Sequence, residues 1–353
     1  MSFSKKIKLD NDENIKPPSQ KKHNYCIDFI KGCACILVVF MHCEFPGRLG
    51  MAIQAVSRFC VPFFFMVSGY FAYTEKIYSA WRKIIHIGQI TLFASLFYII
   101  VAIVKHFVCG TSLAFSLQDV GIWFLSNKPI IIPGQLWFLY ALMYDYVLYA
   151  IVVRLRLQKV AYWMIPLLFI AYFIMAQGAY LCGIKLPNFY RNFLIEGFLF
   201  FMLGNWLHRN EEKASRLLND RILCSLVAVS TILCLVERCF LGRDFGVNLF
   251  TFPQVIFLFI LGMRNSTKFD THLLTDIGAK LSMYVYILHM FVWKEVVNRT
   301  YRLFHISDNC LALYFKPILV LLLTLLISYA VVLVKDCFRR KKERTAEHTL
   351  SVP

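Results

Sequence analysis

The chain of 353 residues lacks the short signatures that mark many soluble enzymes. No Gly-x-Ser-x-Gly nucleophile elbow occurs, so a serine hydrolase of the α/β type is not expected. The twelve cysteines form no Cys-x-x-Cys pair and have no histidines at metal-ligand spacing, so the sequence predicts no metal site. No segment repeats with a period of roughly 20 to 50 residues, and none is long enough for a second, soluble domain.

Long apolar runs, in contrast, are abundant. Hydrophobic residues make up 59% of the chain, well above the share in an ordinary soluble domain. Ten stretches can each cross ~30 Å of hydrocarbon as a helix of about 20 residues. The short alternating segments that a membrane β-barrel needs are missing. The sequence therefore predicts an all-α, polytopic bundle of about ten transmembrane helices in a cell (inner or plasma) membrane.

The predicted spans lie between a polar tail and a basic tail. Residues 1–26 contain no apolar run and are expected to be a disordered cytoplasmic tail rather than a cleavable signal peptide. Residues 27–337 form the predicted membrane domain, and residues 338–353 a basic cytoplasmic tail. The predicted spans are 27–44, 53–74, 84–107, 135–153, 160–180, 189–207, 220–240, 247–263, 273–294 and 312–336.

The basic residues are distributed unevenly between the two predicted sides. With the N-terminus in the cytoplasm, 24 of the 38 Lys and Arg residues are cytoplasmic, 11 are outside and three lie within spans. This bias follows the positive-inside rule and places both termini in the cytoplasm. The net charge of +17 is thus expected to serve orientation and contact with membrane lipids, and no nucleic acid partner is expected. Six cysteines near outer ends leave a disulfide open: Cys43, Cys60, Cys109, Cys182, Cys239 and Cys310.

The first span contains three ionisable groups within "IDFIKGCACILVVFMH", residues 27–42. Lys31 and His42 are eleven positions apart. At about 100° per residue they share one helix face, with His42 roughly 16 Å further along. Asp28 lies one turn before Lys31 and can pair with its ammonium group. Because a charge against lipid costs about 2.5 to 3.5 kcal/mol, this face is expected to line a polar cavity.

Other spans also carry charge. Arg58 lies at a depth comparable to His42, Glu196 is in the sixth span, and His289 is in the ninth. Taken singly, Asp28, Lys31 and His42 are also compatible with interfacial positions, where lysine side chains extend toward water. Ionisable groups in most spans nevertheless indicate a functional polar cavity.

Six segments occur in one order along the chain, and together they resemble the acyltransferase 3 family over roughly residues 25–340. Members of that family are multi-span membrane enzymes that move acyl groups, usually acetyl, from acyl-CoA to sugars of cell-surface polysaccharides. The segments are "IDFIKGCACILVVFMH", "VPFFFMVSGYF", "WRK", "LWFLYALM", "GFLFFMLGNWL" and "IGAKLSMYVYILH".

The resemblance implies roles for several residues. The family's first-span signature is an Arg, ten residues and a His, and Lys31 with His42 keeps this spacing with Lys in place of Arg. His42 is implied as the leading catalytic residue. Arg82 and Lys83 are implied as a basic pair near the phosphates of acyl-CoA (acetyl-CoA), the expected co-substrate. His289 matches the histidine of the ninth-span motif, with an open role.

Acyl transfer to a hydroxyl needs a base and a group that stabilises the oxyanion. A partly desolvated histidine stays neutral and can accept a proton, so His42 is the expected base. Either Arg58 or Lys31 would stabilise the oxyanion, with Asp28 orienting Lys31. Direct transfer is favoured, although Ser68, Cys43 or a tyrosine as a transient acyl carrier remains open. The candidate substrate contacts are Trp137, Tyr140, Glu196 and His289, of which Trp137 and Tyr140 are equally typical interfacial anchors.

Three classes of function stay open at this point. The first is an acyltransferase of the cell envelope, with a glycan or lipid-linked saccharide as acceptor. The second is a permease of a small polar solute or glycan, because intramembrane charges also serve transport, although no inverted repeat is visible. The third is a passive scaffold, which leaves the charged residues of the first span unexplained.

The predicted orientation can be tested with reporters. A reporter fused after Pro353 is expected in the cytoplasm, and one inserted in the predicted outer loop 108–134 is expected outside. Enzyme fusions that are active on only one side of the membrane measure this directly. The reverse pattern would contradict the assignment of the two sides.

Overall fold

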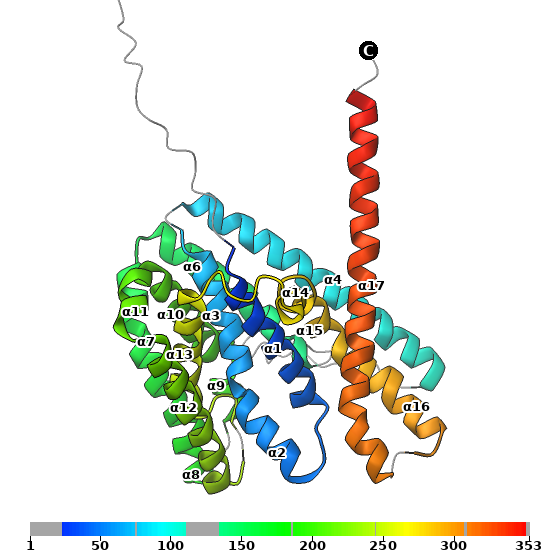
Figure 1. The fold of residues 1–353 in the computed structure, drawn as a ribbon, viewed down its shortest axis with the longest axis horizontal. Coiled ribbons are helices and arrows are strands. Elements are labelled where there is room, and N and C mark those ends of the chain that lie inside the picture. Colours follow the sequence, from blue (N-terminus) through cyan, green and yellow to red (C-terminus); the bar gives the residue numbers. More distant parts are fainter. Residues whose placement is uncertain are drawn as a thin grey trace, which may run out of the picture.

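The computed structural model describes residues 23–74, 76–110, 134–184, 186–243, 245–306 and 309–350. All regular structure in these ranges is helical, so the predicted all-α, polytopic bundle is confirmed (Figure 1). The predicted tail 1–26, apart from residues 23–26, and most of the predicted loop 108–134 lie outside the described residues.

The helical elements follow one another along the chain with π-helical turns at η3 to η6. Their bounds are α1 (Tyr25–His42), α2 (Gly47–Val56), η1 (Ser57–Phe59), α3 (Cys60–Ala72), α4 (Ile77–Cys109), η2 (Gly134–Leu136), α6 (Trp137–Arg154), α7 (Gln158–Phe173), η3 (Ile174–Gly178), α8 (Ala179–Leu181), α9 (Pro187–Tyr190), η4 (Phe193–Gly197), α10 (Phe198–Arg209), α11 (Glu211–Leu217), α12 (Asp220–Leu241), α13 (Thr251–Arg264), α14 (Leu273–Asp276), η5 (Ile277–Leu281), α15 (Ser282–Phe291), η6 (Val292–Val297), α16 (Asn298–Leu303) and α17 (Cys310–Leu350).

Among the described residues, seven helical segments are long and apolar enough to cross a membrane. Three of the ten predicted spans fall elsewhere: 189–207 on η4 and α10, 247–263 on α13, and 273–294 on the run from α14 to η6. The 14 residues of α13 measure about 21 Å, less than the ~30 Å hydrocarbon core. The count of ten stays a prediction.

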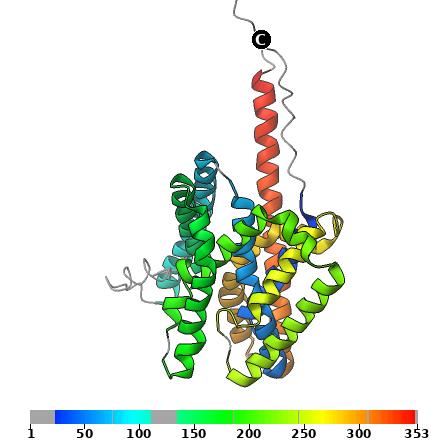
Figure 2. The ribbon, with the colours of Figure 1, turned by 90° about the vertical axis from the view of Figure 1, so that its left-hand side faces the viewer.

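The two termini of the bundle lie at the same end. In Figure 1, α1 starts in the upper part of the bundle and runs down to His42, whereas α17 starts at the bottom and ends at the top. We call the upper end the Asp28 end and the lower end the His42 end. α17 continues past residue 337, where the basic tail was predicted to start, and its last turns extend beyond the other helices in both side views (Figures 1 and 2).

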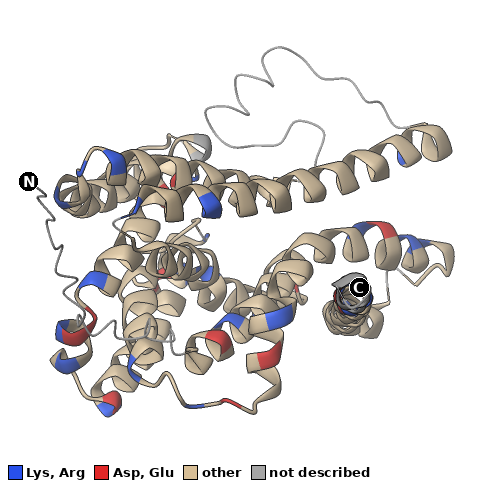
Figure 3. Ribbon diagram, turned by 90° about the horizontal axis from the view of Figure 1, so that it is seen from above, with Lys and Arg blue, Asp and Glu red and all other residues tan. Residues whose placement is uncertain are grey.

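The outer surface of the bundle is apolar, as contact with lipid requires. α4 carries no charged residue between Lys83 and Lys105, and Figure 3 shows this helix uncharged over most of its length. Phe93 is 70% exposed and Phe107 is 81% exposed. A row of exposed aromatic and aliphatic side chains this long is unfavourable in water but suits the interior of a bilayer.

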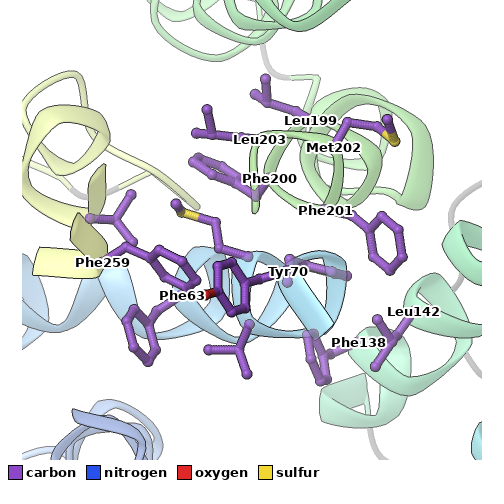
Figure 4. Close-up of a cluster of buried hydrophobic side chains, with 14 of the residues drawn as sticks. Phe63, Tyr70, Phe138, Leu142, Leu199, Phe200, Phe201, Met202, Leu203 and Phe259 are labelled. Carbon is purple, nitrogen blue, oxygen red and sulfur yellow. The ribbon is translucent and has the colours of Figure 1, made fainter. Parts of the chain in front are cut away.

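The core forms where α3 packs against α10. Phe63 and Tyr70 of α3 lie against the phenylalanines of α10 and Phe259 of α13, and Phe138 approaches from α6 (Figure 4). Gly69 and Gly204 allow this contact. A Cβ atom at Gly69 would clash with the carbonyl oxygen of Phe201, and one at Gly204 with that of Met66. Small residues that let backbones touch are the usual basis of helix packing in membranes.

A second pair of glycines brings α1 against α14 and η5. A Cβ atom at Gly32 of α1 would clash with the carbonyl oxygen of Leu274, and one at Gly278 of η5 with that of Asp28. The contact therefore tolerates no side chain on either element. It fixes α1, which ends at His42, against the segment that continues into α15.

The cysteines make no cross-link in this arrangement. All twelve are free, so none of the outer six forms a disulfide in this structure. Cys35, Cys43 and Cys60 are buried and pack as small apolar side chains. No group of three His, Cys, Asp or Glu residues that could hold a metal ion occurs in the described ranges.

Replacing Gly69 by Ala should destabilise the bundle by about 1–3 kcal/mol, because an added methyl group has no space against the carbonyl of Phe201. Gly88→Ala on α4 is the matched control, since a Cβ there meets nothing within 4 Å. That control should be neutral or stabilising by up to about 1 kcal/mol. Thermal unfolding of the purified protein in detergent measures both. Equal midpoints for the two variants would contradict the glycine contact.

Candidate active site

α1 begins with a cap and an ion pair. The side chain of Asn24 accepts a hydrogen bond from the Ile27 amide, which satisfies one free N–H at the helix start. Lys31 Nζ donates to Asp28 Oδ1 at 2.7 Å, as its spacing predicted. His23 Nε2 lies 2.7 Å from the other oxygen of Asp28. The carboxylate of Asp28 thus holds two basic groups at this end of the helix.

His42 is the last residue of α1, and its ring meets that of His289 of α15. The ring centroids are 5.0 Å apart, with 37° between the planes. His289 is 1% exposed, whereas His42 is half-buried. His289 Nδ1 lies 3.0 Å from the carbonyl oxygen of Val285, so Nδ1 carries the hydrogen, because a carbonyl can only accept. The Nε2 atom of neutral His289 is then a buried acceptor, and it has no partner among the described residues.

Three cationic side chains lie near His42. Arg58 of η1, Arg191 and Lys294 of η6 are close enough to act on His42 electrostatically. Arg58 Nη2 donates to Gln54 Oε1 at 2.8 Å, and Gln54 Nε2 donates to the carbonyl oxygen of Met41 at 2.5 Å. Gln54 therefore ties Arg58 to the last turn of α1, next to His42. The predicted match in depth between Arg58 and His42 is confirmed.

Glu196 supplies the nearby carboxylate. It lies on the π-helical turn η4, is 1% exposed and is acted on by Arg191 and Arg58. Its Oε2 atom has no hydrogen-bond partner among the described residues. The guanidinium of Arg191 lies 5.5 Å from the ring centroid of Trp137, which places Trp137 beside the same cluster. π-helical turns occur often at functional sites. Glu196 lies on one such turn, η4, and Lys294 on another, η6.

Hydrogen bonds of two tyrosine hydroxyls connect the residues next to His289. Tyr286 donates to the carbonyl oxygen of Gln135, and the Gln135 side-chain amide donates to Tyr98 at 3.1 Å. Tyr98 in turn donates to the carbonyl of Ile287 at 2.6 Å. Sequence reasoning named neither Gln135 nor Tyr98. Tyr140, a predicted substrate contact, instead pairs with Ser95 of α4 at 2.7 Å.

Lys31 and Asp28 do not join this cluster. They lie at the opposite end of α1, roughly 16 Å away along the helix. The same face carries Cys35 and Val38 between Lys31 and His42, and both are buried in the apolar core. The expected continuous polar face is therefore wrong for the middle of α1, because apolar side chains of neighbouring helices pack against it.

Arg82 and Lys83 also lie at the Asp28 end, within the first turns of α4 rather than in a loop. The guanidinium of Arg82 is exposed and lies 4.9 Å from the ring centroid of Tyr78. Lys83 donates to the carbonyl oxygen of Phe71. Neither side chain contacts the histidine pair.

A basic cavity that sequence reasoning missed opens at the same end. It encloses about 550 Å³ between the start of α7 and the ends of α3, α6 and α10. Arg209 lies 5.7 Å from the ring centroid of Tyr162, and Tyr73 stacks on His208. The basic run 154–159 and the pair 208–209 were visible in the sequence, but nothing in it indicated that they meet. The charged residues of its wall are Arg156, Lys159 and Arg209.

The fold and the site together define a helical membrane protein with a buried cluster of two imidazoles, cations and one carboxylate. Residues 24–336 match the family model described as an acyltransferase domain, that of the acyltransferase 3 family. Neither the curated proteins nor the solved structures give a match to this chain. Because the family match covers nearly all of the 353 residues, the chain belongs to this family of membrane acyltransferases.

The geometry separates the two candidates for oxyanion stabilisation. Arg58→Met should lower the acyl-transfer rate by about 100- to 1000-fold, as for loss of an oxyanion partner. Lys31→Met should lower it by less than about tenfold, because Lys31 lies at the other end of α1 and pairs with Asp28. Initial rates at saturating substrates measure both, with the yield of monodisperse protein as a control for folding. A larger loss in Lys31→Met would place the reacting atoms at the Asp28 end.

Proposed function

We propose that this protein transfers an acyl group, most simply acetyl, from acyl-CoA to a hydroxyl group of a cell-surface or lipid-linked glycan. The observation that carries the proposal is the cluster of His42, His289 and Arg58 inside a chain of the acyltransferase 3 family. The cluster combines a proton acceptor with a fixed cation. These are the two parts that transfer from a thioester to an alcohol requires.

In the proposed reaction, the acceptor hydroxyl attacks the thioester carbonyl while His42 takes its proton. A C–O bond forms, and the carbonyl oxygen becomes an oxyanion beside the Arg58 guanidinium. The C–S bond then breaks, and the thiolate of CoA leaves with the proton that His42 returns. His42 is the better candidate for the base because it is half-buried, whereas His289 is fully buried. His289 positions the His42 ring or the substrate hydroxyl through its unpaired Nε2.

The charged part of acyl-CoA would bind at the Asp28 end, which the charge bias assigns to the cytoplasm. Arg156, Lys159 and Arg209 offer cations for its phosphates, and Tyr73 and Tyr162 offer rings for its base. Arg82 and Lys83 are a second, more exposed candidate. The thioester would have to reach His42 through the bundle. Because Cys35 and Val38 are packed, the helices around α1 would separate slightly when the donor enters.

Replacing His42 tests the chemical step. His42→Gln and His42→Ala should leave a folded protein that binds acyl-CoA but transfers acyl groups about 100- to 10,000-fold more slowly. His86→Gln, at an exposed histidine of α4, is the matched control and should keep the wild-type rate. The assay uses purified protein in proteoliposomes with radiolabelled acetyl-CoA and a crude glycan acceptor. A His42→Gln variant with more than half of the wild-type rate would show that His42 is not the base.

Variants at the Asp28 end test the proposed binding site for acyl-CoA. Arg156→Ala with Lys159→Ala should raise KM for acyl-CoA more than it lowers kcat, because those residues would contact the nucleotide remote from the reacting bond. Arg82→Ala with Lys83→Ala decides whether the second basic pair shares this role. An unchanged KM in both double variants would move the donor site elsewhere. Solute flux without acyl-CoA in the same proteoliposomes would instead favour a permease.

A further inference from the structure

A second cavity opens at the His42 end of the bundle. It encloses about 1010 Å³ between the last turns of α4, the run from η6 to α16, and the start of α17. Its wall includes Trp293 and Asn298. The indole N–H of Trp293 and the side-chain oxygen Oδ1 of Asn298 are buried and have no hydrogen-bond partner among the described residues. A buried donor without a partner is unfavourable unless a ligand or water completes it.

Cationic side chains dominate the wall. One carboxylate, Glu295, faces them and is already shared: Lys105 lies at 2.7 Å and Arg299 at 3.0 Å from its two oxygens. Among the described residues, Arg302 donates only to the backbone carbonyl oxygen of Asn298, at 3.3 Å, and Lys316 Nζ lies 5.6 Å from the ring centroid of Tyr301. The five cations of the wall are Lys105, Lys294, Arg299, Arg302 and Lys316.

Membrane orientation does not account for this cluster. The charge bias assigns 11 basic residues to the outer side, and five of them line this one cavity. Basic residues on the outer side oppose the positive-inside bias, so they need another reason. Several cations that share one carboxylate repel each other and are stabilised by an anion bound between them.

The cavity adjoins the candidate active site. Lys294 lines the cavity and is also among the charges that act on His42. Lys316 acts in the same way on Cys43, the residue after His42. Val297 and Tyr301 pack in one cluster with Cys43 and Val39 of the α1 segment. An anion in the cavity would therefore be held close to the end of α1.

We propose that this cavity binds a phosphate or diphosphate group of the acyl acceptor, so that the acceptor is an anionic, phosphate-bearing saccharide presented at the His42 end. The identity of the ligand as the acyl acceptor rests on the proposed function, whereas the binding of an anion in this cavity does not. Arginine matches phosphate oxygens through two parallel N–H donors, and Arg299 and Arg302 lie one turn apart on α16 and both line the cavity. A phospholipid headgroup carries the same chemistry and is the competing source.

A binding measurement tests the cavity without acyl transfer. The probe is farnesyl diphosphate, with uncharged farnesol as its control, and the full chain is held in nanodiscs of phosphatidylcholine. Arg302→Gln with Lys316→Gln should weaken farnesyl diphosphate binding by more than about tenfold and leave farnesol binding unchanged. Neither residue pairs with a described carboxylate, so the fold should tolerate the change. Arg339→Gln with Arg340→Gln, near the far end of α17, removes the same charge and should change binding less than about twofold.

The results separate the alternatives. Equal binding of farnesyl diphosphate and farnesol, or equal losses in the two double variants, would overturn the proposal. Loss of probe binding when the nanodiscs contain phosphatidylglycerol would also overturn it, because a lipid headgroup would then occupy the cavity. In the acyl-transfer assay, Arg302→Gln with Lys316→Gln should raise KM for the acceptor and not for acyl-CoA. If the purified protein binds farnesyl diphosphate but shows no acyl transfer, the proposed function is rejected and anion binding in the cavity still holds.

Discussion

Backbone contact at four glycines determines where the candidate catalytic groups lie. Gly69 and Gly204 let α3 touch α10, and these helices follow directly after η1 with Arg58 and η4 with Glu196. Gly32 and Gly278 let α1 touch the segment that leads into α15, and so bring His42 to His289. Helices in lipid gain little from hydrophobic burial against each other, so close packing and interhelical hydrogen bonds must hold them. The Asn205 side chain, which donates to the Gly69 carbonyl at 3.1 Å, is one such bond.

The cluster at the His42 end places several charged side chains inside a helical membrane bundle. Burial of a single charge in hydrocarbon costs about 2.5 to 3.5 kcal/mol on insertion scales. Opposite charges and fixed dipoles offset this cost. Arg58 is held by Gln54, Arg191 lies over Trp137, and Glu196 is close enough to both arginines to interact with them electrostatically. Groups that are fixed in this way do not reorganise when an oxyanion forms, and this is how preorganised sites stabilise transition states.

Much of this architecture was predictable from the sequence, but only along single helices. Periodicity and spacing correctly predicted the helical bundle and the pairing of Asp28 with Lys31. They also suggested that Arg58 and His42 share a depth. They could not show that Cys35 and Val38 close the face between Lys31 and His42, because that depends on what packs against it. The sequence also could not show that Gln54 holds Arg58, that Lys294 lies near His42, or that Arg156, Lys159 and Arg209 line one cavity. Such contacts join spans far apart in the chain, and no local pattern encodes them.

The apolar middle of α1 has a consequence for the cell that houses the protein. At a membrane potential of 100 mV, the movement of one elementary charge across the membrane releases about 2.3 kcal/mol. An open polar path through the bundle would therefore let ions leak and dissipate the potential. Cys35, Val38 and Val39 are buried against the helices around them, so the middle of α1 offers no such path. Under the proposed function, a catalyst whose two basic cavities face opposite ends would transfer an acyl group from one compartment to the other without letting protons and ions cross.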